Sequence, residues 1–308
     1  MSENTIKIAV WNIYGPPPGK QFEKTAHKIK AFQDEVHPDI AFYLEAPEGK
    51  IESLPGRPED SKTAPEEAPE GKIESLPGID PRCWKKTFWV GTGQQGNPRG
   101  ILAVQYNNAL KIKDSVKVEG AVGLGLELAY GTERIQVIGV WTQLPYFESL
   151  KNILHECRKA GFLKPDIPCI VVGDTNLNLS ARAEAEDELK EEDSECMDNR
   201  KKILSLAGNP DDPSCVPDGE HFGLALFPDA DEQKKTLFPG LMQNTWRSKD
   251  AESLWFRCDL MLVSSRVKIV SAELGRLTCL YKDEKRKGYE EVVGSDHRPI
   301  IFEVSVLD

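Results

Sequence analysis

Short apolar segments bounded by carboxylate, amide or imidazole side chains recur from one end of this 308-residue chain to the other. The first of them, residues 6–12, ends at Asn12 and is followed closely by a run of three prolines. Proline lacks a backbone N–H and cannot continue a hydrogen-bonded ladder, so we predict a buried β-strand that stops near Asn12. The last apolar run, 300–306, comes shortly after Asp296 and His297 and predicts a closing strand.

A strand, a helix and a second strand are predicted at the start of the chain. Between residues 21 and 36, apolar side chains recur every three or four positions, which is typical of an amphipathic helix. The apolar run 40–44 then predicts a second strand, which is followed directly by Glu45. This order favours a right-handed crossover unit with a parallel strand pair.

The rest of the chain alternates strands with a few helices and contains no linker that would divide it, so we predict a single domain over residues 1–308. The acidic stretch 184–195 is predicted to be a solvated helix or loop, and 209–240 a long loop. The other predicted elements are helices at 147–159 and 199–207 and strands at 87–90, 101–106, 122–129, 135–140, 168–172, 259–263 and 267–274.

The segment 46–81 differs from the rest in composition. Residues 46–56 return without change at 68–78, and Pro, Glu, Gly and Lys dominate throughout. Such a composition buries too little apolar surface to offset the entropy of ordering it. We interpret the segment as an extended surface insertion that the fold tolerates; a recognition arm is the alternative.

The net charge of −11 argues against a polybasic protein that coats DNA by neutralising its phosphates. It does not exclude a nucleic-acid enzyme with a local basic rim or a bound metal ion. No apolar run approaches the roughly 18 residues of a membrane span, and the polar N-terminus lacks the pattern of a signal peptide.

The seven cysteines are odd in number and form no CxxC pair. This usage favours reduced thiols in a cytoplasmic protein over a zinc site or a disulfide framework. Because nothing in the sequence indicates a partner protein, we expect a monomer.

Polar side chains lie at equivalent ends of the predicted strands. In a sheet of mixed strand direction, the C-terminal ends of some strands and the N-terminal ends of their antiparallel neighbours share one rim. We therefore expect one cluster of side chains from distant parts of the chain. Its members at C-terminal strand ends are Asn12, Glu45, Gln143 and Asp174, and those before strand starts are Asp259, Asp296 and His297.

Several carboxylates at one rim repel each other unless a cation offsets their charge. Carboxylates and amides without thiolates favour Mg²⁺ or Mn²⁺ over zinc. A site of this kind suits the attack of water on a phosphoester. Each residue alone also has a structural interpretation: Asn12 can satisfy a turn, Glu45 can be a loop carboxylate, and Asp174 can form an Asx turn.

The motifs that carry these residues resemble those of the endonuclease/exonuclease/phosphatase superfamily, in the family's order and over almost the whole chain. The resemblance implies a four-layer α/β sandwich, in which two packed mixed β-sheets are flanked by helices. It also implies a Mg²⁺-dependent phosphodiesterase or phosphatase. The motifs are Trp11-Asn12, Leu44-Glu45, Gly173-Asp174-Thr175-Asn176, Asp259 within 257–262, and Ser295-Asp296-His297-Arg298-Pro299.

The resemblance implies a metal site in which Glu45 is the principal ligand, with Asn12 beside it and Asp296 close to the ion.

It implies catalytic roles for four further residues. Asp174 would orient or deprotonate the attacking water, or protonate the leaving oxygen. Asn176 would hold a phosphate oxygen. His297 would contact the scissile phosphate, oriented by Asp259.

Two departures from the family pattern stand out. Gln143 lies where many members have a histidine, and it can donate a hydrogen bond to phosphate but cannot carry a proton. Thr175 stands where an aromatic residue is usual.

Trp255 and Arg257 lie in a segment that looks like the one flanking the aspartate of exonuclease III-like enzymes, and their side chains suit bases and phosphates. The alternative is that the tryptophan belongs to the core.

Three functions follow. The first is a Mg²⁺-dependent nuclease that acts on DNA or RNA. The second is a phosphatase or phosphodiesterase of a small phosphorylated metabolite or lipid headgroup, which the acidic composition favours. The third is a binding protein on the same fold with little turnover, for which Gln143 is the only indication.

Overall fold

The structure is a computed structural model of the 308-residue chain. It describes residues 5–13, 29, 32–47, 86–92, 99–164, 166–179, 194–208, 222, 224–227, 246–247, 255–256, 258–275, 278–283, 288–293 and 297–306.

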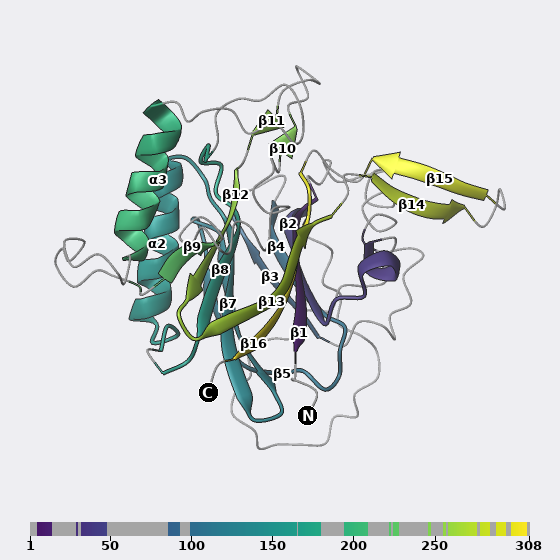
Figure 1. Ribbon diagram of the computed structural model, residues 1–308, viewed down its shortest axis with the longest axis horizontal. Coiled ribbons are helices and arrows are strands. Elements are labelled where there is room, and N and C mark those ends of the chain that lie inside the picture. Colours follow the sequence, from purple (N-terminus) through teal and green to yellow (C-terminus); the bar gives the residue numbers. More distant parts are fainter. Residues whose placement is uncertain are drawn as a thin grey trace.

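Two six-stranded mixed β-sheets form the body of the molecule (Figure 1). The first has the order β13-β16-β1-β2-β4-β3, with β13 Val267–Leu274, β16 Ile300–Val306, β1 Ile6–Asn12, β2 Ile40–Pro47, β4 Arg99–Gln105 and β3 Lys86–Gly91. The second has the order β5-β6-β7-β8-β12-β9, with β5 Lys111–Val118, β6 Gly123–Tyr130, β7 Glu133–Trp141, β8 Cys169–Asp174, β12 Asp259–Ser264 and β9 Leu224–Phe227.

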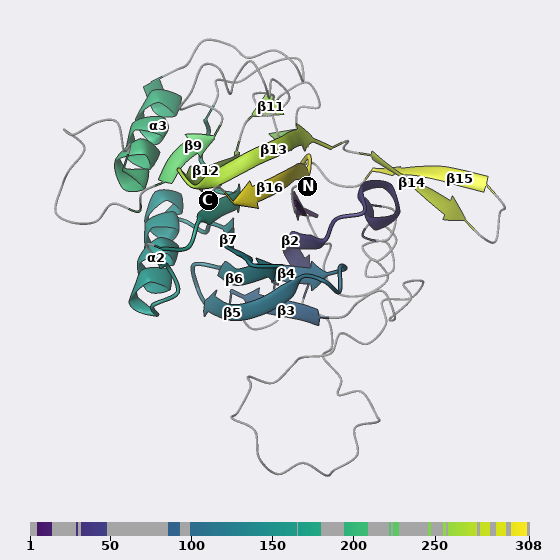
Figure 2. The same cartoon turned by 60° about the horizontal axis from the view of Figure 1, so that its bottom comes forward.

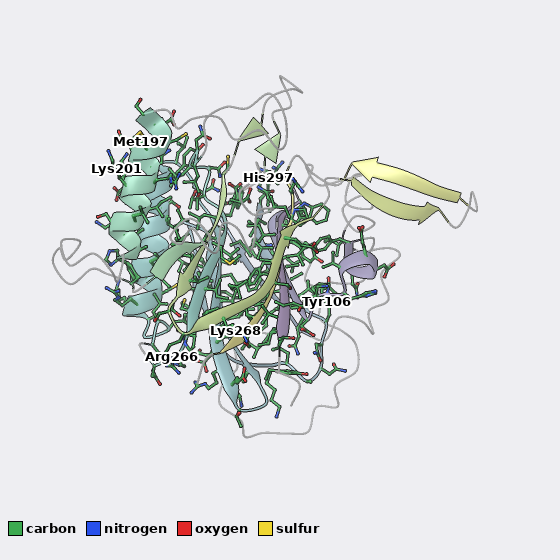
Figure 3. The ribbon with its side chains drawn as sticks, viewed as in Figure 1. Tyr106, Met197, Lys201, Arg266, Lys268 and His297 are labelled. Atoms are coloured by element: carbon green, nitrogen blue, oxygen red, sulfur yellow. The ribbon has the colours of Figure 1, made fainter. Side chains whose placement is uncertain are left out.

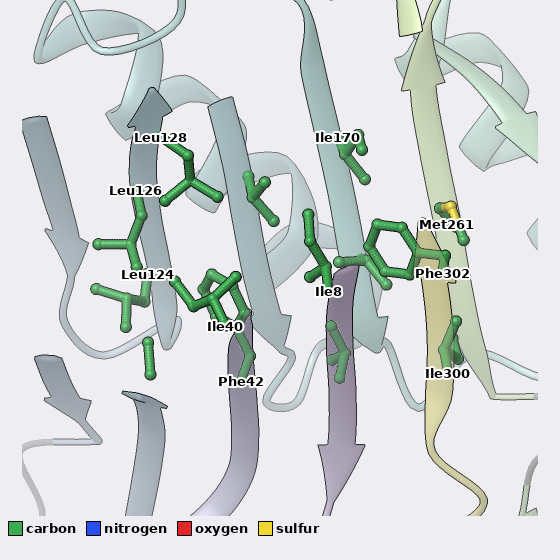
Figure 4. Packing of buried hydrophobic residues seen from close by; sticks show 14 of the residues in the cluster. Ile8, Ile40, Phe42, Leu124, Leu126, Leu128, Ile170, Met261, Ile300 and Phe302 are labelled. Atoms are coloured by element: carbon green, nitrogen blue, oxygen red, sulfur yellow. The ribbon is translucent and has the colours of Figure 1, made fainter. Parts of the chain in front are cut away.

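The two sheets pack face to face, and the largest apolar cluster lies between them. Figure 4 shows Ile8, Ile40 and Phe42 of the first sheet close to Leu124, Leu126 and Ile170 of the second. Alternate residues of each strand point into this layer, as the period of two along a strand requires. The large apolar area removed from water here is the main stabilising term of the fold.

Helices cover the outer faces of both sheets. Helix α2, Tyr146–Lys159, and helix α3, Ser194–Ala207, lie side by side against the second sheet (Figures 1 and 2). Helical residues 32–36 pack through Phe32 and Val36 against the first sheet. The layers are therefore helix, sheet, sheet and helix, which confirms the predicted four-layer sandwich.

Helix α2 shows why a predicted helix forms where the pattern indicates. Its buried face carries Leu150, Ile153, Leu154 and Cys157, at the spacing that places side chains on one side of a helix. Glu148 lies in the first turn and Lys159 in the last, where each complements the helix dipole.

Most predicted strands are confirmed, including the parallel β1–β2 pair. The β6–β7 hairpin turns at Gly131 and Thr132, and Gly131 adopts a φ of 64° that glycine accepts without strain. β16 closes the first sheet between β1 and β13, as the run 300–306 predicted.

Other predictions were wrong. The supposed loop 209–240 contains β9, a four-residue edge strand that pairs with β12. Helix α3 begins at Ser194, five positions before the predicted start at 199. Five further strands lie where none was predicted: β5, the short paired strands β10 Trp246–Arg247 and β11 Trp255–Phe256, and the paired strands β14 Thr278–Asp283 and β15 Gly288–Val293. Strands β14 and β15 extend away from the two sheets (Figures 1 and 2).

Some predictions fall outside the described residues. Of the duplicated segment 46–81, only Ala46 and Pro47 are described. The thiols of Cys157, Cys169, Cys196 and Cys258 are buried. In the part of the chain that the structure covers, no helix is both long enough and apolar enough to cross a membrane.

Candidate active site

Asp174 is the last residue of β8, and its side chain is almost fully buried. It lies opposite Asp259, the first residue of the antiparallel strand β12. One carboxylate oxygen, Oδ2, accepts a hydrogen bond of 2.8 Å from Asn12 Nδ2, and the other, Oδ1, accepts one of 2.8 Å from the backbone N–H of Asn176. Ends of three separate chain segments therefore meet at this carboxylate.

His297 stands between two carboxylates. Its Nδ1 lies 3.0 Å from Asp259 Oδ2, and its Nε2 lies 3.8 Å from Asp174 Oδ2. The backbone is held as well, since Trp11 Nε1 donates a hydrogen bond of 3.0 Å to the His297 carbonyl. Figure 3 shows His297 at the opposite end of the sheets from Arg266 and Lys268.

The environment of Asp174 favours its protonated form. Burial raises the pKa of the Asp174 carboxyl to about 7. His297 acts in the opposite direction, and the Asp259 carboxylate adds to the rise. Hydrogen bonds from Asn176 and Asn12 also act to lower this pKa, but burial outweighs them. Asp174 can therefore both release and accept a proton near neutral pH.

Glu45 reaches the same rim through an irregularity in β2. Tyr43 pairs with Leu102 and Ala46 with Gly100, so two residues of β2 stand opposite one of β4, which is a β-bulge. Glu45 itself has a φ of 53°, in the left-handed region.

The Glu45 carboxylate has two partners on the protein. Its Oε1 accepts from Asn12 Nδ2 at 3.3 Å, and its Oε2 accepts from Arg99 Nη1 at 2.8 Å. Asn12 Nδ2 thus joins the carboxylates of Glu45 and Asp174.

Asn176 and Gln143 share one acceptor. Asn176 Nδ2 lies 3.2 Å from the Thr142 carbonyl oxygen, and Gln143 Nε2 lies 3.3 Å from the same atom. Asn176 also has a left-handed φ of 52°, which carries the chain sharply away from the end of β8. Each side-chain amide has a second hydrogen with which to meet an external acceptor.

The position of Thr175 explains the lack of an aromatic residue there. Its side chain is fully buried, and both its backbone N–H and its hydroxyl donate to the Cys258 carbonyl, at 3.1 and 2.8 Å. These bonds tie the end of β8 to the start of β12 and set the separation of Asp174 and Asp259.

Seven predicted residues come together: Asn12, Glu45, Gln143, Asp174, Asn176, Asp259 and His297. Asp296 and Arg257 lie outside the described residues, as does the side chain of Trp255. The Trp255 backbone pairs with Arg247, which joins strands β10 (Trp246–Arg247) and β11 (Trp255–Phe256).

The prediction missed Arg99, Trp11 as a hydrogen-bond donor, and the structural threonines Thr142 and Thr175. The only signal for Arg99 was its place between a glycine-rich turn and an apolar strand. Thr142 donates its hydroxyl to the Thr175 carbonyl, an interaction that no pattern in the sequence indicated.

The donor atoms fit a hard divalent cation. Glu45 and Asn12 offer carboxylate and amide oxygens, the ligands that Mg²⁺ and Mn²⁺ prefer. The sulfur of Cys258, next to Asp259 in the sequence, faces Asn178 Oδ1 at 3.7 Å instead of joining the cluster.

A second group of possible ligands is Asp174, Asp259 and His297, whose donor atoms lie within 4.8 Å of one another. This group is buried, and its His297 Nδ1 and Asp259 Oδ2 atoms already form a hydrogen bond with each other, which a cation would have to break. The Glu45–Asn12 pair is the better fit, because Glu45 is only partly buried and its bonds to Asn12 and Arg99 lie at a more exposed rim than the imidazole bond.

No protein-family model matches the chain, and no curated protein matches it significantly. Solved structures do match over nearly the full length. An endonuclease/exonuclease/phosphatase family protein from Leptotrichia buccalis has a TM-score of 0.55 at 14% identity, covering 98% of this chain and 100% of that one.

Two further similar structures contain bound ligands. TDP2 from D. rerio, complexed with a single-strand DNA product, has a TM-score of 0.56 at 13% identity, with 99% of this chain and 100% of that chain covered. The human nocturnin catalytic domain with a bound sulfate anion has a TM-score of 0.55 at 13% identity, with 99% and 97% covered. The chain therefore has the fold of the endonuclease/exonuclease/phosphatase superfamily.

Proposed function

We propose that this protein hydrolyses phosphodiester bonds with the help of Mg²⁺ or Mn²⁺, and that its substrate is a nucleic acid. The observation that carries the proposal is the buried Asp174 carboxyl, with a pKa of about 7, next to the His297–Asp259 pair. Proton-carrying groups of this kind suit the protonation steps of phosphoester hydrolysis. Support comes from the shared fold and from the DNA product bound to TDP2 from D. rerio.

In this proposal Asp174 holds or moves the proton. Its Oδ2 is the carboxylate oxygen that faces His297 Nε2, at 3.8 Å. In its anionic form Asp174 accepts a proton from an attacking water, and in its neutral form it can give one to a leaving oxygen.

His297 binds the phosphate through Nε2. Asp259 accepts from Nδ1, so Nε2 carries a hydrogen only when the ring is cationic. The Asp259 carboxylate stabilises that charge, and Asp174 adds to the effect when it is anionic. In this proposal, the second amide hydrogens of Asn176 and Gln143 donate to other phosphate oxygens. Glu45 and Asn12, with Asp296, would hold the cation, which supplies positive charge against the phosphoryl oxygens when bound.

A second candidate substrate is a small phosphorylated metabolite or lipid headgroup. The net charge of −11 favours it, since an acidic surface repels a long polyanion. A binding protein without turnover is the third candidate, and Gln143 is its only support.

A substrate panel separates these candidates. Single-stranded DNA, duplex DNA, abasic DNA, RNA and bis(4-nitrophenyl) phosphate are each incubated with the protein and Mg²⁺ or Mn²⁺, with EDTA as the control. Cleavage of a nucleic acid well above the rate for the small ester supports the nuclease. Cleavage of the small ester alone supports the second candidate, and no turnover with either ion contradicts the proposal.

A further inference from the structure

Arg99 forms an ion pair with the residue that the proposed function makes the main cation ligand. Its Nη1 lies 2.8 Å from Glu45 Oε2, and the two side chains are 21% and 15% exposed. Because Asn12 donates to the other oxygen, protein donors contact both carboxylate oxygens of Glu45. The charge that Glu45 would direct at a cation is thus already balanced by a guanidinium.

The backbone of Arg99 is fixed by the sheet. Arg99 is the first residue of β4 and pairs with Pro47 of the neighbouring strand β2. Its carbonyl oxygen accepts a hydrogen bond of 3.1 Å from the Thr92 backbone N–H. The next residue is Gly100, where an added Cβ would lie 1.9 Å from the Val90 carbonyl oxygen. Strands β3 and β4 therefore approach each other closely beside Arg99, and this packing fixes the position of the Arg99 backbone.

A guanidinium and a divalent cation cannot share this carboxylate without cost. Each would face the other's positive charge at a few ångströms, and that repulsion is only partly screened at a half-buried rim. A cation that binds Glu45 therefore weakens the hold of Arg99. Planar guanidinium groups bind phosphate oxygens with two parallel hydrogen bonds, so a phosphodiester is a suitable new partner.

We propose that Arg99 is a positioning residue that holds Glu45 before cation binding and then turns to the phosphodiester of the substrate. This inference rests on the proposed function, because it takes Glu45 as a cation ligand. It makes cation and substrate binding cooperative. A phosphodiester that engages Arg99 releases Glu45 for the cation, and by linkage each ligand tightens the other.

Calorimetric titration with Mn²⁺, with and without dimethyl phosphate as the probe, tests this coupling. The variants are Arg99→Met, Arg99→Lys and Glu45→Gln. The matched control is Arg134→Met, which removes another arginine that pairs with a glutamate, Glu127. Thermal melts establish that each variant is folded before it is titrated.

We expect Arg99→Met to bind Mn²⁺ about tenfold more tightly than the wild type, because an opposing charge has been removed. Arg99→Lys keeps the charge and should stay close to the wild type, as should Arg134→Met. Dimethyl phosphate should tighten Mn²⁺ binding by the wild type and have no such effect on Arg99→Met.

Two results would overturn the inference. One is equal or weaker Mn²⁺ binding by folded Arg99→Met, and the other is an unchanged effect of dimethyl phosphate in that variant. Failure of the proposed function looks different: wild type and Glu45→Gln would then bind Mn²⁺ equally, or neither would bind it.

Discussion

Replacing Asp174 with asparagine should remove a pH-dependent loss of stability. A carboxyl whose pKa rises from 3.8 in the unfolded chain to about 7 in the folded protein binds its proton more tightly when folded. This tighter proton binding contributes stability to the folded state that is fully present below pH 3.8. The contribution is lost as the pH rises from 3.8 to about 7. Asparagine carries no such proton, so the stability of the variant should lack this component.

The expected size follows from the linkage slope. Stability changes by about 1.4 kcal/mol per pH unit while only the folded state holds the proton, so the wild type should lose about 2 kcal/mol between pH 5.5 and 7. The Asp174→Asn variant also forfeits a hydrogen bond, because the single carbonyl oxygen of its new amide cannot replace both carboxylate oxygens, which accept from Asn12 and Asn176. That loss, about 1–3 kcal/mol, is the same at every pH and does not affect the comparison of slopes.

The assay is urea unfolding of both proteins in EDTA at several pH values from 5.5 to 8. The exposed Asp198, replaced by asparagine, is the control. We expect the difference in unfolding free energy between wild type and Asp174→Asn to shift by about 2 kcal/mol in favour of the variant as the pH rises. Parallel curves would refute the claim that Asp174 holds a proton near neutral pH.

Three further predictions concern other parts of the molecule. Asp259→Asn, which weakens the hold on His297 Nδ1, should leave the fold intact and lower kcat by about 10²–10⁴ with little change in KM; an unchanged kcat would contradict the pairing. Gly139→Ala should lower the unfolding free energy by about 1–3 kcal/mol, because the added Cβ would lie 2.7 Å from the Phe42 ring, and an unchanged urea midpoint would show that the ring moves freely. Deletion of residues 56–68 should leave a cooperative thermal melt, and its loss would show that the insertion belongs to the folded core.

The strands and the rim were predictable because their signals are local. A buried strand such as β8 is a continuous apolar run, and a carboxylate at its end is visible in the sequence. Strand direction then brings Asp174 and Asp259 together, whatever their distance along the chain. Glu45 was predicted at the same rim for the same reason.

The parts that were not predicted depend on partners that the sequence does not reveal. β5 carries mostly exposed, charged residues and forms an edge strand only because β6 lies beside it. Buried β9 is short and follows a polar stretch, so no period was apparent. The contact of Arg99 with Glu45 depends on a β-bulge, an irregularity of register that has no clear sequence signature here.

The central claim, that a cation held at Glu45 is needed for phosphodiester hydrolysis, is tested most directly by one rate comparison. Cleavage of bis(4-nitrophenyl) phosphate in Mg²⁺ is measured for the wild type, for Glu45→Gln and for the exposed control Glu119→Gln. We expect Glu45→Gln to lose at least about 100-fold in rate and Glu119→Gln to match the wild type. Equal rates for the wild type and Glu45→Gln would contradict the claim.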